Sequence, residues 1–246
     1  MIRIVIDNRT EGKFLAQHGL SILIKDDKRI LFDAGQDGRV LEYNLKLMGE
    51  VEKFDYFILS HGHYDHSDGL KFLIENELID RVVMHKDALK ERYYKNRYIG
   101  VSEEVKKLLD KVDIIFIKNK FKIDKNNMVL GEIERNFYYE SDISEGKKDL
   151  VEDEIIFITN NKLITGCSHS GIINVVEYAK KYFDINFVIG GFHLINSSEK
   201  YINEVYNYFR SNNIKLAPLH CTGFRALTKL SNLPNFIYSY SGRAIE

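Results

Sequence analysis

Residues 60–70 read SHGHYDHSDGL, and this stretch decides how the rest of the chain is interpreted. Three of the chain's eight histidines and one aspartate fall within six residues of it, and they are His61, His63, Asp65 and His66. The apolar run DYFIL at 55–59 precedes the stretch, and GLKFLIEN at 69–76 spaces its apolar residues as a helix does. The sequence therefore predicts a polar loop held by two rigid elements.

The residue types in this loop are those that bind transition metals. Imidazole nitrogens and carboxylate oxygens are ligands for zinc, iron or manganese, and ligands close together on one loop need little ordering to converge. As surface or core residues they would crowd four ionisable groups without a counter-charge. No CxxC pair accompanies them, which disfavours a structural zinc ribbon. We expect a catalytic metal site with open coordination positions.

Three further histidines follow apolar runs later in the chain. His169 lies in TGCSHSG after KLIT, His193 lies in GGFHL after INFVIGG, and His220 lies in PLHCTG after IKLAPL. Each histidine is thus expected just beyond the end of a strand. The alternation of short apolar runs and helical stretches along the whole chain predicts layered sheets with helices outside, an α/β fold.

These motifs together resemble the metallo-β-lactamase superfamily, whose signature is HxHxDH after a buried strand. The resemblance implies an αββα four-layer sandwich with two divalent metal ions, zinc or else manganese or iron, in a cleft at the edge of two sheets. It implies two ligand sets, His61, His63 and His169 for one metal and Asp65, His66 and His220 for the other. Asp65 would also act as the catalytic proton acceptor.

The chain departs from the superfamily pattern at the bridging acid. Most members place an aspartate on the strand between the last two histidine ligands, but this chain reads VIGGFHLI at 188–195, with no carboxylate. His193 stands nearest that position, and it either ligates the second metal or touches substrate. Without the bridging acid, weaker binding of a second metal is expected.

The resemblance extends beyond the ligands to one branch of the superfamily. QHGLSILIKDDKRILFDAGQ at 17–36, together with the histidine motifs, is similar to proteins labelled 7,8-dihydropterin-6-methyl-4-(β-D-ribofuranosyl)-aminobenzene 5'-phosphate synthase-like. The similarity covers nearly the whole chain outside 86–153. We therefore expect a single domain over 1–246 with a variable insert around 86–153.

Four other side chains have two interpretations each. Asp33 in LFDAGQ orients a ligand histidine from behind or is a turn carboxylate. Cys167 and Cys221 flank expected ligands and act as thiolates or are buried structural thiols. His85, at a strand end, lines the pocket or packs in the core, and His18 lies outside any ligand pattern.

The segment 86–98, KDALKERYYKNRY, interleaves basic and aromatic residues. Arg92, Tyr94 and Arg97 are the candidates there for binding an anionic, aromatic substrate. The alternative is a solvated helix end whose tyrosines pack on the core. The polar segment 140–153, ESDISEGKKDLVED, is expected to be an exposed loop.

Composition excludes several classes of partner. The 246 residues carry 35 basic and 36 acidic side chains, so a net charge of -1 gives no chain-wide field for nucleic acid. No apolar run approaches the roughly 18 residues of a membrane helix. Two cysteines make no disulfide framework and the start MIRIVIDNRT lacks signal-peptide regions, so we expect a cytoplasmic protein of open oligomeric state.

The leading functional hypothesis is a metal-dependent hydrolase of a small anionic or phosphorylated molecule. A water between two metals loses a proton near neutral pH, becomes a metal-bound hydroxide and attacks the substrate. The branch resemblance gives an alternative, a pterin-ribofuranosylaminobenzene phosphate synthase-type condensing enzyme. The missing bridging acid gives another, a non-catalytic metal-binding sensor.

Overall fold

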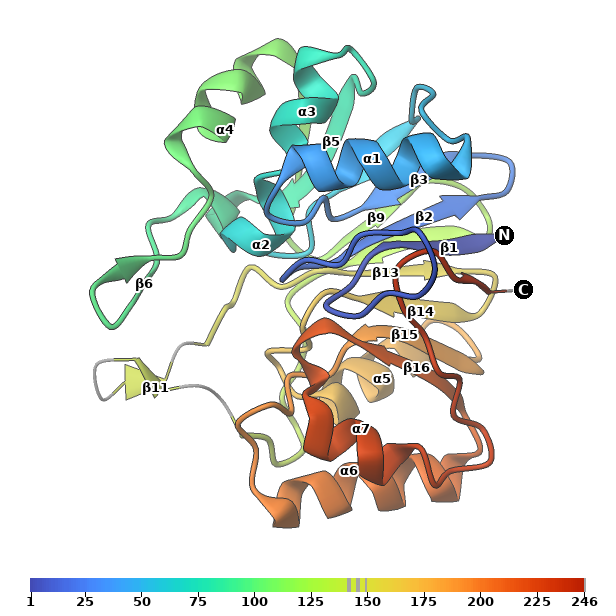
Figure 1. Cartoon of the computed structure of the whole chain (residues 1–246). Helices are drawn as coiled ribbons and strands as arrows, with labels where there is room; N and C mark the ends of the chain where they lie inside the picture. Colours follow the sequence, from blue (N-terminus) through green and yellow to red (C-terminus); the bar gives the residue numbers. More distant parts are fainter. Residues whose placement is uncertain (141–142, 145–146, 149, 246) are drawn as a thin grey trace. The chain divides into compact units, whose positions relative to one another are not determined.

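The computed structural model describes residues 1–140, 143–144, 147–148 and 150–245 (Figure 1). The chain divides into two compact units, the first Met1–Ile117 with Tyr240–Glu246 and the second Lys118–Ser239. Each unit has its own sheet, helices and apolar core, so the predicted α/β class is confirmed. The single domain with an insert around 86–153 stays a prediction.

The first unit is built on a seven-stranded sheet of order β17-β1-β2-β3-β4-β5-β8. Its strands are β1 Ile2–Ile6, β2 Ser21–Lys25, β3 Arg29–Phe32, β4 Tyr56–Ile58, β5 Arg81–His85, β8 Asp113–Ile117 and β17 Ala244–Ile245. From β3 to β8 the neighbours pair in parallel. Because parallel strands end at the same edge, the loops after β3, β4 and β5 leave the sheet together.

Three helices cover one face of this sheet: α1 Gly38–Met48, α3 Leu70–Glu75 and α4 Glu103–Leu108 (Figure 1). Asp37 caps α1 by accepting from the Arg39 amide, and Ser102 caps α4 by accepting from the Val105 amide. Leucines and isoleucines of the helices bury themselves against alternate strand residues such as Phe57. This packing fixes the strands from whose ends the loops leave the sheet.

The second unit is built on a six-stranded sheet of order β16-β15-β14-β13-β10-β9. Its strands are β9 Lys120–Lys122, β10 Asn127–Leu130, β13 Ile156–Thr159, β14 Lys162–Thr165, β15 Phe187–Gly191 and β16 Lys215–Leu219. β14, β15 and β16 are parallel and in register, so that Thr165 faces Gly190 and Gly191 faces Leu219. These three strands also end at one common edge.

The helices of the second unit are α5 Ile172–Lys180, α6 Glu199–Asn212 and α7 Phe224–Leu230 (Figure 1). Ser198 caps α6 through the Tyr201 amide. The core between these helices and the sheet includes Phe192 stacked on Phe209, with ring centroids 5.5 Å apart. Each helix follows directly on a strand-end loop, as in a chain of βα units.

The remaining elements are short. They are α2 Tyr64–Ser67, the 3₁₀ turns η1 Lys86–Leu89, η2 Leu109–Lys111 and η3 His220–Thr222, and the paired strands β6 Tyr93–Tyr94 with β7 Arg97–Tyr98 and β11 Ile143–Ser144 with β12 Lys147–Lys148. The segment 86–98 is therefore a turn and a hairpin, not the end of a helix.

The expectation for the polar segment also differs from the structure. In the segment 140–153, positions 141–142, 145–146 and 149 lie outside the described residues, but Val151 and Asp153 are buried and not exposed as expected. No helix of the described chain is long and apolar enough to cross a bilayer.

Candidate metal centre

The histidine-rich loop of the first unit leaves the sheet after β4 and includes the short helix α2. His61, Asp65 and His66 are buried, and His63 is half-buried. Four polar side chains therefore share a region largely withdrawn from water. Such burial is costly for ionisable groups unless each has a partner, so their contacts decide what the loop can do.

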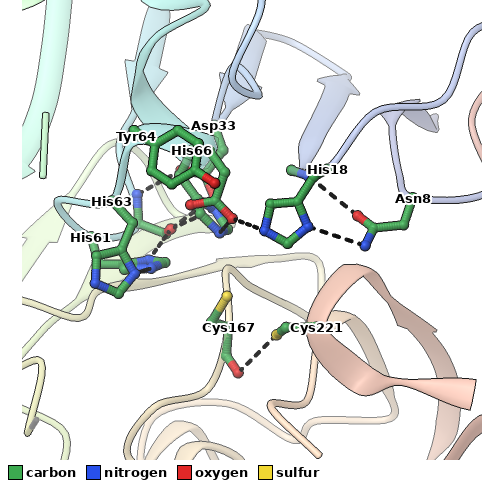
Figure 2. A network of polar contacts seen from close by, with 12 residues as sticks. Asn8, His18, Asp33, His61, His63, Tyr64, His66, Cys167 and Cys221 are labelled. Atoms are coloured by element: carbon green, nitrogen blue, oxygen red, sulfur yellow. Dashed lines mark hydrogen bonds and ion pairs between the residues drawn. The ribbon is translucent and has the colours of Figure 1, made fainter. Parts of the chain in front are cut away.

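Asp33 lies directly after β3, and its carboxylate contacts residues of the histidine-rich loop (Figure 2). Its carboxylate accepts from the Ser60 amide at 2.8 Å, from Ser60 Oγ at 2.7 Å and from His66 Nδ1 at 2.6 Å. The carboxylate commits Nδ1 of His66, so Nε2 is the nitrogen that remains to act as a ligand. Asp33 therefore makes the contacts that are needed to orient His66 as a metal ligand.

His61 and His63 present their ring nitrogens to one another. His61 Nε2 and His63 Nδ1 lie 2.9 Å apart, while His61 Nδ1 lies 2.9 Å from Ser60 Oγ. Two nitrogens on one tetrahedral zinc at about 2.1 Å would be about 3.4 Å apart. A small rotation of either ring therefore converts this pair into two ligands of one cation.

Asp65 has a partner that the sequence analysis did not assign. His18, from the loop before β2, places Nε2 3.0 Å from Asp65 Oδ2, and its other ring nitrogen lies 3.4 Å from Asn8 Nδ2 (Figure 2). The His18 side chain is 52% exposed, whereas that of Asp65 is 10% exposed. His18 thus links a buried carboxylate to solvent. Its only sequence signal was its place in the motif QHGL at 17–20.

Gly62, between the first two histidines, is required by a close approach. A Cβ at this position would lie 1.8 Å from the carbonyl oxygen of Ala88 in η1. No side chain can occupy that space without moving η1 or the loop. The turn after β5 is thus packed directly on the backbone of the metal-binding motif.

His85 lies at the end of β5 and is 4% exposed. Its Nδ1 accepts from the Asp87 amide at 3.2 Å, and its Nε2 has no hydrogen-bond partner among the described residues. The geometry is compatible with either interpretation of this residue, and a pocket role for His85 stays a prediction.

In the second unit, the three expected histidines follow the ends of the three parallel strands. His169 comes after β14, His193 after β15 and His220 directly after β16. His193 has φ 50° and His220 has φ 45°, and Ser168 beside His169 has φ 58°. Left-handed backbone in residues other than glycine is costly and gathers at functional sites. The rings of His169 and His193 lie 4.2 Å apart by centroid.

Two thiols lie at the same edge of the second sheet. Cys167 and Cys221 are both buried and form no disulfide, and Cys221 Sγ lies 3.7 Å from the carbonyl oxygen of Cys167 (Figure 2). Burial opposes ionisation of Cys221, but hydrogen bonds from Cys167 and His193 and the nearby His220 outweigh it and hold its pKa well below the usual range.

Glu154 supports the loop around His169 and was missed by the sequence analysis. Its carboxyl group is buried and accepts from the His169 amide at 2.7 Å and the Ser170 amide at 2.9 Å. Burial raises the pKa of Glu154, although the two amides act against that shift. The residue sits just after the polar segment 140–153, where nothing in the local pattern indicates burial.

The predicted substrate-binding residues lie around the β6–β7 hairpin of the first unit. Tyr94 and Arg97 are exposed and Arg92 is half-buried. The Arg97 guanidinium lies 5.2 Å from the centroid of the Tyr64 ring and 3.4 Å from its hydroxyl oxygen. Tyr64 belongs to the histidine-rich loop, so the hairpin brings a positive charge to that loop.

The donor sets fit a divalent transition metal. The first unit supplies imidazoles, one of them carboxylate-supported, and a carboxylate, and the second unit supplies imidazoles and thiols at one sheet edge. These are the nitrogen, oxygen and sulfur ligands of zinc and its neighbours. The predicted sharing of metals between ligands of the two units stays a prediction.

Comparison with known sequences finds close relatives, although no family model matches the chain. The chain is 53% identical over 254 residues to the uncharacterized protein MJ0448 of Methanocaldococcus jannaschii, covering 100% of this chain and 99% of that protein. It is 32% identical over 247 residues to the 7,8-dihydropterin-6-methyl-4-(β-D-ribofuranosyl)-aminobenzene-5'-phosphate synthase of the same organism, covering 87% and 83%.

Comparison with solved structures also finds similar proteins. The crystal structure of Tm1679, titled a metal-dependent hydrolase of the β-lactamase superfamily, has a TM-score of 0.86 at 30% identity and covers 100% of this chain and 98% of that one. YhfI from Bacillus subtilis, a metallo-β-lactamase fold protein, has a TM-score of 0.60 at 14% identity over the same shares and shows the fold alone. The fold predicted from the sequence is confirmed.

Proposed function

The chain belongs to the metallo-β-lactamase superfamily, and we propose that it is a hydrolase of a small anionic or phosphorylated molecule that uses two divalent metal ions, with zinc the first choice. The observation that carries the proposal is the supported imidazole of His66. Asp33 holds one ring nitrogen at 2.6 Å, and the other ring nitrogen lies 3.9 Å from Asp65. This arrangement raises the basicity of a metal-binding histidine and determines which nitrogen binds.

The proposed ligands are those implied by the superfamily resemblance. They are His61, His63 and His169 for one cation and Asp65, His66 and His220 for the other, and His193 is a further candidate. Divalent cations held by such ligands acidify water and polarise a phosphoryl or carbonyl oxygen.

Two side chains of the protein would accept the proton released by the water and pass it to solvent. Asp65 is the proposed proton acceptor, and His18 Nε2 lies 3.0 Å from its carboxylate. A proton taken up by Asp65 can pass to His18, whose half-exposed ring can release it to solvent. His18 therefore extends the role proposed for Asp65 beyond the buried loop.

The charge of the substrate is recognised by the hairpin. Arg97 is held over Tyr64, which positions a guanidinium next to the loop. Burial and the nearby Asp65 charge raise the pKa of Tyr64, so its hydroxyl group stays protonated and can donate to a substrate oxygen. A guanidinium and a hydroxyl donor side by side suit a phosphate or carboxylate better than a neutral group.

The test uses the zinc-loaded protein with panels of phosphoesters, thioesters and lactones. His63→Ala is expected to lower bound zinc and abolish turnover, and full turnover by a metal-free variant would overturn the proposal. Arg97→Gln is expected to raise KM for phosphorylated substrates by about tenfold, the equivalent of one charge-assisted hydrogen bond. Arg210→Gln is the matched control, because Arg210 also stacks on a tyrosine, 5.7 Å from the Tyr206 centroid, but lies on α6.

A second candidate function is a condensing synthase. It is favoured by the 32% identity to the dihydropterin-ribofuranosylaminobenzene phosphate synthase over 87% of this chain. Here the cations would bind a pyrophosphate leaving group while a carbon nucleophile attacks. Incubation with a pterin pyrophosphate and an aminobenzene ribotide tests it, and release of pyrophosphate with a condensed product would displace the hydrolase proposal.

A further inference from the structure

The second unit gathers sulfur and nitrogen donors at the common edge of β14, β15 and β16. Cys167 lies two residues beyond β14, His193 two residues beyond β15, and Cys221 one residue after His220 at the end of β16. The strands are parallel and paired residue by residue, and the Gly191 amide donates to the Gly166 carbonyl at 2.9 Å. The strand ends therefore cannot drift apart without breaking the ladder.

The donor atoms form two overlapping groups within this unit. The first is Cys167, His220 and Cys221 and the second is Cys167, His169 and His193, and within each group all ligand atoms lie within 4.8 Å of one another. Sulfur and nitrogen ligands of one tetrahedral zinc are about 3.6 Å apart. Each pair exceeds that value by at most about 1.2 Å, so small side-chain rotations would bring either group to bonding geometry. Cys167 is the member that both groups share.

The strand that would carry a bridging carboxylate is closed to side chains. A Cβ at Gly191 would lie 2.5 Å from the Gly166 carbonyl oxygen and 2.6 Å from Cys221 Sγ. At Gly190, φ is +134° and a Cβ would lie 1.9 Å from the Thr165 carbonyl oxygen. An aspartate on this part of β15 would displace either the Cys221 sulfur or the neighbouring strand. The Gly166 carbonyl oxygen and the Cys221 sulfur atom together occupy the room that an acidic side chain at position 191 would need.

No carboxylate takes part in these two groups among the described residues of the second unit. The buried Glu154 is committed to two backbone amides, those of His169 and Ser170. The neutral imidazoles of this unit cannot offset the charge of a dication, and an uncompensated charge is unfavourable in a buried site. The thiols are the groups at this edge that can supply negative charge.

We propose that Cys167 and Cys221 bind a divalent cation as thiolates together with His220, so that sulfur replaces the missing bridging carboxylate. Each thiol loses its proton to solvent when the metal–sulfur bond forms. Soft thiolate ligands select zinc, ferrous iron or cobalt over manganese and magnesium. The inference rests on the proposed function only in requiring a bound cation, and it does not depend on hydrolysis.

The chain has only two cysteines, so any thiolate–metal signal comes from them. We expect the cobalt-substituted protein to show a sulfur-to-cobalt charge-transfer band in the near ultraviolet. Cys167→Ser and Cys221→Ser should each weaken the band, and the double variant should abolish it. Loss of the hydrogen-bond partner behind a metal ligand lowers metal affinity by about 10- to 100-fold. Loss of a thiolate ligand itself is therefore expected to lower zinc affinity by at least about 100-fold.

Cys221→Asp supplies a matched control for simple disruption of the core. It restores an anionic ligand without sulfur, so it should recover zinc affinity relative to Cys221→Ser while the charge-transfer band stays weak. A purely structural thiol gives no reason for that recovery, and its absence would count against the proposal.

A measurement on the unaltered protein covers the case in which the variants do not fold. X-ray absorption at the zinc edge should show zinc–sulfur scattering at about 2.3 Å. Bound zinc with only nitrogen and oxygen neighbours would overturn the inference. A charge-transfer band without hydrolysis of any substrate would leave this inference standing and remove the proposed function, whereas hydrolysis without the band would do the reverse.

Discussion

The support that Asp33 gives to His66 makes Asp33→Asn a sharp test of the metal centre. Asp33 has φ 58°, a left-handed conformation that asparagine also adopts readily, so the substitution keeps the backbone and removes the charge. The three groups around the carboxylate are all donors, the Ser60 amide, Ser60 Oγ and His66 Nδ1, at 2.6 to 2.8 Å. An asparagine must present its own NH₂ group to at least one of them.

The expected magnitude follows from that count. A hydrogen bond to a charged group contributes about 1.5–3 kcal/mol. Loss of a carboxylate behind a ligand histidine lowers metal affinity by about 10- to 100-fold, which is about 1.4–2.8 kcal/mol. The two energies agree because both describe the hydrogen bond between Asp33 and His66. We therefore expect Asp33→Asn to weaken zinc binding by roughly this factor.

Zinc affinity is measured by competition with a chromophoric chelator, and the stability of the metal-free protein by denaturant unfolding. Asp37→Asn is the matched control, because Asp37 caps α1 and asparagine is an equally good N-cap. Folded Asp33→Asn protein with unchanged zinc affinity would refute the role assigned to Asp33. An equal loss in the Asp37 variant would show that the effect is not specific to the site.

Two other predictions address the scaffold. Gly62→Ala places a Cβ 1.8 Å from a carbonyl oxygen of η1, so it should lower the amount of bound zinc and lower the free energy of unfolding by about 1–3 kcal/mol. Gly12→Ala is the comparison, because a Cβ at position 12 meets open space, and it should leave the amount of bound zinc unchanged. Burial opposes ionisation of Glu50, but hydrogen bonds from Arg29 and Lys25 outweigh it and lower its pKa. A lowered pKa stabilises the fold above the unfolded value of about 4.3, and that stability is lost as pH falls through the folded pKa. Glu50→Gln should thus cost about 2 kcal/mol at pH 7 and progressively less in acid, measured by unfolding over a pH series, and a pH-independent difference would contradict this account.

The sequence alone located the elements that local pattern controls. Most helices and strands fall where apolar periodicity and capping residues indicate, as α6 does between Ser198 and Asn213. The HxHxDH loop could be recognised because its four ligand residues lie within six positions of the chain. His169, His193 and His220 were found because each follows its own apolar strand.

Tertiary structure alone decided the contacts between distant segments. His18 contacts Asp65, 47 positions away in the sequence, and Glu154 accepts a hydrogen bond from the His169 amide. The two cysteines are 54 residues apart, and they lie close together beside Gly191. None of these pairs has a local signal, because a strand's neighbours in a sheet are set by long-range pairing and not by its own residues. The sequence determined which chemical groups stand at the strand ends, and only the order and register of the strands determined which of those groups meet.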